Sequence, residues 1–255
     1  MSGARGSLYL VPNTLDFGSA EPLPKIQEVL PLGVIRIAAR LQHWVAENPK
    51  TTRAFLKRVD AVVPLAVPLQ MLRIVELPRA PKGRPTAAAH DLGALLEPAH
   101  AGHDVGLMSE AGLPAVADPG AALVQAAHAE DIPVVALAGP SALLLALAAS
   151  GLNGQSFAFV GYLPVEASAR AARICELEAL SRRSGQTQMM IETPYRNVAL
   201  LGALLAHLQP PTRLSVSCGL TLARGFTRTD TVSAWQSRAT QLPGNVPAVF
   251  ALLAG

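Results

Sequence analysis

Residues 106–120, GLMSEAGLPAVADPG, decide how this chain is interpreted. The stretch has the glycine, proline and acidic content of a loop, but Leu107 and Val116 are interleaved in it as in a packed segment. A strand is expected just before it, at 104–108, and a helix just after it begins, at 120–129. Open α/β sheets bind ligands at the carboxyl ends of their strands, so this loop is a candidate ligand site.

Short apolar runs alternate with helical periodicity along the chain, which predicts an α/β fold with parallel sheets connected by helices. Besides 104–108, strands are expected at 7–12, 43–48, 132–137, 157–164, 187–192, 213–218 and 246–254. Besides 120–129, helices are expected at 22–41, 86–98, 140–149, 166–183 and from 194 onward. Asn48 is expected to cap a further helix that begins at Pro49.

The pattern is interrupted at 151–156, GLNGQS, and a second series of strands and helices follows. We therefore expect two α/β lobes, residues 1–154 and 155–255. The default ligand site is a cleft between them.

An uncharged run at 132–152 has the length of a membrane span. Pro133, Gly139 and Pro140 interrupt it where a helix in lipid would lose backbone hydrogen bonds, so it is interpreted as a buried strand, a turn and a helix. The two cysteines form no CxxC motif, the six histidines have no metal-ligand spacing, and there is no secretory n-region. We expect a cytoplasmic protein without a metal site or membrane association.

Basic residues are concentrated between Arg36 and Arg84, where ten lysines and arginines stand against three acids. The segment carries a net charge of +7, which leaves −4 for the rest of a chain whose total is +3. Such a segment is either a solvated helix face or a surface that binds a polyanion.

Two common nucleotide signatures are absent from the sequence. There is no GxGxxG after the first strand and no GxxxxGK[ST]. Both an ordinary Rossmann dinucleotide site and a P-loop are therefore disfavoured.

Five segments at the ends of expected strands carry a family resemblance. They are LYLVPNTL (8–15), the opening stretch, ALAGPSALLLALAASGL (136–152), FAFVGYLP (157–164) and MMIETPYRNVALL (189–201). Together they resemble the tetrapyrrole methylase family of S-adenosylmethionine-dependent methyltransferases. The likeness is strongest to the branch that includes the bacterial small-subunit ribosomal RNA ribose 2′-O-methyltransferase.

The resemblance implies S-adenosylmethionine as methyl donor, S-adenosylhomocysteine as product, and a homodimer. The loop after the 104–108 strand offers close backbone approach, and Glu110 offers an acceptor for the amine or ribose of the donor. The residues implied to bind the donor are Pro12, Ser109, Glu110, Ala111, Gly112, Leu113, Ser141, Ala142, Glu192, Gly219, Leu220 and Ala248.

Glu47 is the candidate general base, because it ends an expected strand and an RNA ribose hydroxyl needs its proton removed. Glu47 is also interpretable as a capping or salt-bridging acid, and Asp118 is interpreted as a helix cap. The residues expected to hold RNA phosphates are Lys50, Arg53, Lys57 and Arg58.

The sequence departs from the ribosomal branch at two motifs. Residues 47–50 read Glu-Asn-Pro-Lys instead of Glu-Asp-Thr-Arg, and residues 218–222 read Cys-Gly-Leu-Thr-Leu instead of Arg-Glu-Leu-Thr-Lys. Three functions therefore stay open: an RNA methyltransferase, a methyltransferase for a small molecule such as a tetrapyrrole, and a non-catalytic S-adenosylmethionine-binding protein.

Overall fold

The computed structural model describes residues 5–16, 23–78, 92–238 and 241–255. It divides into two compact units, an N-terminal one that ends at Pro140 and a C-terminal one that begins at Ser141. The boundary expected from the sequence, between 154 and 155, follows helix α6 (Ala142–Ser150). The division precedes α6 because that helix packs on strands of the C-terminal sheet.

The N-terminal unit is built on a five-stranded sheet of order β3-β2-β4-β1-β5, and every described pairing in it is parallel. Its strands are β1 (Leu8–Leu10), β2 (His43–Ala46), β3 (Arg73–Glu76), β4 (Val105–Met108) and β5 (Val134–Ala136). The expectation of a parallel sheet is confirmed for this half. The sequence analysis missed β3, whose four residues, RIVE, form too short a run to stand out.

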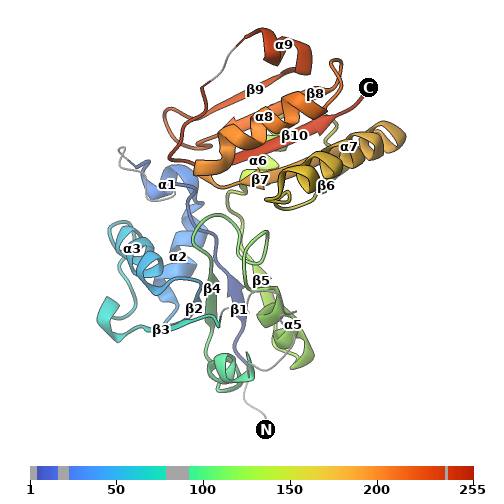
Figure 1. Cartoon of the computed structure of the whole chain (residues 1–255). Helices are drawn as coiled ribbons and strands as arrows, with labels where there is room; N and C mark the ends of the chain where they lie inside the picture. The colour runs from blue at the N-terminus through green and yellow to red at the C-terminus, as the bar shows by residue number, and fades with distance from the viewer. Residues whose placement is uncertain (1–4, 17–22, 79–91, 239–240) are drawn as a thin grey trace. The chain divides into compact units, whose positions relative to one another are not determined.

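Helices cover both faces of this sheet, as parallel sheets require (Figure 1). They are α1 (Ile26–Val29), α2 (Leu32–Arg40), α3 (Pro49–Asp60), η1 (Leu69–Met71), η2 (Leu92–Leu95), α4 (Glu97–His100) and α5 (Ala121–Ala129). Trp44 packs into the core under α2 and α3, and its neighbour Val45 packs into the core under α5. Asn48 caps α3 by accepting from the Lys50 amide at 3.0 Å, as predicted. The expected helix at 86–98 lies partly outside the described residues.

The C-terminal sheet has the order β6-β7-β10-β8-β9, and here the expectation of parallel strands is wrong. Its strands are β6 (Phe157–Phe159), β7 (Thr187–Glu192), β8 (Arg213–Cys218), β9 (Phe226–Thr231) and β10 (Ala248–Leu253). Only β6 and β7 pair in parallel; the other neighbours are antiparallel. The connection from β8 to β9 spans residues 219–225, too short for the crossover that parallel strands need.

The second unit also has helices on both faces of its sheet. Helix α6 covers one face with Ala146 and Leu147, and α7 (Ala167–Ser184) and α8 (Asn197–His207) cover the other. A 3₁₀ turn, η3 (Pro194–Arg196), leads into α8. The apolar run at 132–152 is β5, a turn and α6, as interpreted from its prolines and glycine. Among the described residues, no helix is long and apolar enough to cross a membrane.

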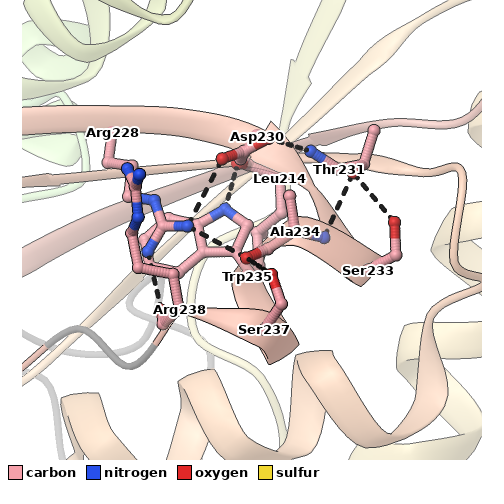
Figure 2. A network of polar contacts seen from close by, with 9 residues as sticks. All are labelled: Leu214, Arg228, Asp230, Thr231, Ser233, Ala234, Trp235, Ser237 and Arg238. Atoms are coloured by element: carbon pink, nitrogen blue, oxygen red, sulfur yellow. Dashed lines mark hydrogen bonds and ion pairs between the residues drawn. The ribbon is translucent and has the colours of Figure 1, made fainter.

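Strand β9 and the short helix α9 (Val232–Ser237) were also missed, because FTRTDT lacks apolar alternation. Figure 2 shows what holds them. The Arg228 guanidinium lies over the Trp235 ring, 4.0 Å from its centroid, and its Nη2 is 3.3 Å from Asp230 Oδ2. Trp235 donates its indole N–H to the Leu214 carbonyl at 2.8 Å. Polar and cation–π contacts thus add to the burial of Val232 and Trp235 in fixing this edge.

Candidate functional site

A cavity of about 570 Å³ opens at the carboxyl end of the N-terminal sheet. Its lining residues are Glu47, Leu77, Pro78, Leu92, Glu110, Asp118, Pro119, Gly120, Ala121, Ala122 and Leu123. Glu47 directly follows β2, and Glu110 stands two residues after β4. These strands are parallel neighbours, so their carboxyl ends bring both acids to one edge of the sheet.

Glu47 and Glu110 are tied to each other by hydrogen bonds. The Glu110 amide donates to Glu47 Oε2 at 3.0 Å. The Asn48 side chain donates to Glu110 Oε1 at 2.7 Å, while its own oxygen caps α3. The interpretation of Glu47 as a helix cap is wrong, because Asn48 performs that role.

Asp118 is not the helix cap that the sequence suggested. The N-cap residue of α5 is Gly120, with φ of 131°, and no side chain caps this helix. Asp118 lines the cavity instead, where burial raises its pKa from 3.8 to about 7, assisted by the negative charges of Glu47 and Glu110. A carboxyl group in this state exchanges a proton near neutral pH.

The loop that follows β4 is fastened to the end of β1 by Asn13, a residue that the sequence analysis overlooked. Asn13 is 4% exposed. Its amide donates to the Gly112 carbonyl at 2.9 Å, and its side chain donates to the Glu110 carbonyl at 2.7 Å. The link places the predicted donor residues that follow β4 beside Pro12. These residues are Ser109, Glu110, Ala111, Gly112 and Leu113.

Two observations agree with the binding of a methyl donor, through its nucleoside and amino-acid tail, near this loop. The Ser109 hydroxyl is buried in this loop and has no hydrogen-bond partner, a state that calls for a ligand or a water molecule as partner. A Cβ added to Gly139 would lie 2.2 Å from the Pro12 Cβ, so the 136–140 turn approaches Pro12 only because it has glycine there. Gly139 was noted in the sequence only as a break in an apolar run.

The other predicted donor residues lie in the C-terminal unit. Glu192 on β7 pairs in register with Ala248 on β10, which in turn pairs with Cys218 on β8. Gly219 and Leu220 follow Cys218 directly. Ser141 is the N-cap residue of α6, and Ala142 and Leu220 pack against the same apolar cluster.

The four predicted phosphate contacts divide into two kinds. Lys50, Arg53 and Lys57 are exposed and share one face of α3. Arg58 is committed to the fold: its guanidinium contacts Asp16 Oδ2 at 2.5 Å and the Pro24 carbonyl at 3.0 Å. Of the wider basic segment, Arg79, Lys82 and Arg84 lie outside the described residues.

Within the described ranges, no group of three or more His, Cys, Asp or Glu residues is placed to hold a metal ion. Cys218 is buried, and burial raises the pKa of its thiol to about 11. A thiol with this pKa stays protonated at neutral pH and is a poor nucleophile.

The folds of two solved structures are similar to this chain. The methyltransferase CobJ aligns with a TM-score of 0.56 and 16% identity, over 98% of this chain and 100% of its own. The uroporphyrin-III-C-methyltransferase from Thermus thermophilus aligns with a TM-score of 0.50 and 19% identity, over 98% of this chain and 92% of its own. At these identities the likeness concerns the fold.

Curated relatives are more similar in sequence. "Ribosomal RNA small subunit methyltransferase I" of Mesorhizobium japonicum is 37% identical over 157 residues, which cover 59% of this chain and 52% of the relative. The protein of that name from Streptococcus pyogenes serotype M3 is 30% identical over 201 residues, 79% of this chain and 60% of the relative. This chain thus spans about half the length of such relatives.

The family resemblance drawn from the sequence is confirmed by a family model. Residues 36–233 match the model described as Tetrapyrrole (Corrin/Porphyrin) Methylases, which is well over half of the chain. The matched region covers most of both expected lobes and includes the loop at 106–120. The chain belongs to the tetrapyrrole methylase family.

Proposed function

We propose that this chain is an S-adenosylmethionine-dependent methyltransferase that methylates a ribose 2′-hydroxyl of small-subunit ribosomal RNA. The observation that carries the proposal is the acidic cavity at the carboxyl edge of the parallel sheet, in a chain similar to proteins named ribosomal RNA small subunit methyltransferase I. S-adenosylhomocysteine is the expected product.

The charge of the cavity supports this donor. S-adenosylmethionine carries a sulfonium and an ammonium group, and when bound it supplies an electrophilic methyl group. All charged residues among the described lining residues are acidic, namely Glu47, Glu110 and Asp118. A cavity whose described charged lining residues are all carboxylates favours a positively charged ligand. The Ser109 hydroxyl and the backbone of the Asn13-linked loop are proposed to hold its polar parts.

The exposed face of α3 supports an RNA acceptor. Helix α3 begins directly after Glu47 and Asn48, so its first turn starts beside the cavity. Lys50, Arg53 and Lys57 are proposed to contact phosphates, whereas Arg58 is withdrawn from this set because Asp16 engages it. Glu192, Ser141, Ala142, Gly219, Leu220 and Ala248 stay proposed donor contacts of the C-terminal unit.

A small-molecule acceptor is the second candidate. The cavity volume of about 570 Å³ lies within the usual range for small-ligand pockets. A tetrapyrrole methyltransferase would use the same donor site without needing the basic face of α3. A non-catalytic donor-binding protein is the third candidate, motivated by the altered residues 218–222.

A homodimer and a cytoplasmic location also belong to this proposal. Large apolar side chains are exposed on the C-terminal unit, including Val165 at 73%, Tyr195 at 81% and Val198 at 66%. Patches of exposed apolar surface mark interaction sites. Sedimentation at micromolar concentration tests the dimer, and a monomer alone would contradict it; cell fractionation tests the location.

Transfer of a labelled methyl group separates the three candidates. The protein is incubated with labelled S-adenosylmethionine and, in parallel, with small ribosomal subunits, with their free RNA and with a reduced tetrapyrrole. Label in RNA that is recovered in 2′-O-methyl nucleosides is the expected result. Label only in the tetrapyrrole would support the second candidate, and donor binding by calorimetry without any transfer would support the third.

A further inference from the structure

We infer that Asp118, rather than Glu47, is the general base that accepts the proton of the acceptor hydroxyl. The inference rests on the proposed function, because it assigns a role within the same cavity. It departs from the sequence-based expectation, in which Glu47 was the base and Asp118 a helix cap.

The hydrogen bonds around the cavity distinguish the three carboxylates. Glu47 Oε2 accepts from the Glu110 amide, and Glu110 Oε1 accepts from the Asn48 side chain. Asp118 has no hydrogen-bond or ion-pair partner in the part of the chain that the structure describes. Among the described residues nothing engages either oxygen of Asp118, whereas Glu47 and Glu110 each use one oxygen to hold the loop.

The backbone directs Asp118 to the cavity. Gly120, with φ of 131°, takes the N-cap position of α5, so Asp118 is displaced from the place where its side chain would cap. A Cβ on Gly120 would approach Leu107 Cδ2 to 3.0 Å, which shows how tightly the turn packs on β4. Ala117, immediately before Asp118, has φ of 62°, a left-handed conformation that alanine rarely adopts.

The charges that face Asp118 suit a base. Glu47, after β2, and Glu110, in the loop after β4, line the same cavity and act on Asp118 through their negative charge, while the described lining residues of α5 are uncharged. Desolvation and these two charges raise the pKa of Asp118 to about 7. General bases are most effective when their pKa lies near the working pH.

The proposed step balances as follows. The Asp118 carboxylate accepts the proton of the ribose 2′-hydroxyl while that oxygen forms a bond to the methyl carbon of the donor. The carbon–sulfur bond breaks and its electron pair stays on sulfur. The products are the methyl ether, the neutral thioether and a protonated Asp118, which returns its proton to water.

The test compares Asp118→Asn with Glu47→Gln, and with Asp131→Asn as a matched control. Asp131 is exposed in a turn with φ of 53°, a conformation that asparagine also tolerates, and it does not line the cavity. Turnover on RNA should fall by about 100-fold or more in Asp118→Asn. Filter-binding affinity for RNA should stay within about 2-fold, and calorimetric affinity for S-adenosylhomocysteine should fall by far less than turnover does. The control should match the parent.

The pH dependence gives a second readout. Parent turnover should rise with pH to a plateau above about 7, because Asp118 must be ionised to accept a proton. Glu47→Gln removes a negative neighbour, so its rising limb should move to lower pH. Asp118→Asn should lose this limb.

Several outcomes would overturn the inference. Turnover of Asp118→Asn within about 3-fold of the parent would do so. Loss of S-adenosylhomocysteine binding in that variant would show a donor-binding role instead. Loss of the pH limb in Glu47→Gln alone would return the base to Glu47. A parent that transfers no methyl group to RNA would refute the proposed function and this inference together, whereas the other outcomes leave the proposed function standing.

Discussion

The acidic residues of the two units differ in the hydrogen-bond and ion-pair partners that surround their carboxylates. In the C-terminal unit, Glu178 and Glu192 are 4% and 2% exposed, and both have partners. Glu178 accepts from the Gln209 amide at 2.8 Å and from the Thr212 hydroxyl. Glu192 accepts from the Thr193 amide at 2.8 Å and lies 2.8 Å from Arg196 Nη2, an ion pair outside hydrogen-bond geometry. Both acids are compensated.

In the N-terminal unit, three carboxylates line one cavity that no described cation lines. Glu47 and Glu110 also accept hydrogen bonds, so among the five acids compared Asp118 is the one without a partner in the described residues. Hydrogen-bond donors offset the desolvation of the buried Glu178 carboxylate. Asp118 has no such donor among the described residues, and burial raises its pKa.

The largest effect is expected for Glu178→Ala. The change leaves the Gln209 amide and the Thr212 hydroxyl without an acceptor in a buried region, which should lower the free energy of unfolding by about 3 kcal/mol. Glu176→Ala is the matched control on the same helix, because Glu176 is 65% exposed and pairs only with Arg173. It should change stability by less than about 0.5 kcal/mol. Equal effects in urea denaturation would contradict a structural role for Glu178.

Asp118→Asn should act in the opposite direction and stabilise the fold. A carboxyl whose pKa is raised in the folded state from 3.8 to about 7 weakens the fold progressively as pH rises between these values. Removing it should add about 1–2 kcal/mol at pH 8, after allowance for solvent screening, and nothing below pH about 4. Urea denaturation at both pH values measures this. A stability loss at pH 8 would show that Asp118 is compensated.

Arg58→Ala and Arg53→Ala should separate fold from RNA binding. Arg58→Ala leaves Asp16 without its ion pair and should cost about 1 kcal/mol of stability. Arg53→Ala should leave stability nearly unchanged. It should reduce the slope of log K for RNA binding against log salt concentration by roughly one. Thermal unfolding and RNA binding at several salt concentrations test both. An unchanged salt slope in Arg53→Ala would remove it from the proposed RNA surface.

The smallest effect concerns His43, which begins β2 at the amino end of the N-terminal sheet, opposite the cavity. Burial, His103 and Arg73 lower its pKa from 6.5, so the unfolded chain takes up a proton more readily than the folded one. Stability should therefore be full above pH about 6.5 and fall as the pH decreases below it. His43→Gln should reduce this slope between pH 7 and 5. A parent whose stability rises on acidification through that range would contradict the sign.

Short sequence patterns predicted much of the fold. Asn48 before Pro49 predicted the start of α3, and the breaks at Pro133, Gly139 and Pro140 divided an apolar run into β5 and α6. The antiparallel pairing in the C-terminal sheet was not foreseen, because strand direction depends on which distant strands become neighbours. Strand β10, last in the chain, inserts between β7 and β8, and no local pattern encodes that.

The candidate site was predicted in part. Glu47 and Glu110 were identified from their places after strands, and the structure brings them into one cavity. Asp118 was misassigned, because the motif Asp-Pro-Gly before a helix has the appearance of a cap. The positive φ of Gly120 and the charges facing Asp118 exist only in the folded loop. Asn13 was overlooked because its contacts span almost a hundred residues.

The pH titration of the Asp118 carboxyl carbon by NMR, in protein labelled with ¹³C aspartate and assigned with Asp118→Asn, tests the central claim most directly. That claim is that Asp118, unlike the other two cavity carboxylates, has no partner among the described residues and is therefore available for chemistry. The account predicts a midpoint near pH 7 in the parent and a lower midpoint in Glu47→Gln. A parent midpoint near 4, unaffected by Glu47→Gln, would contradict it.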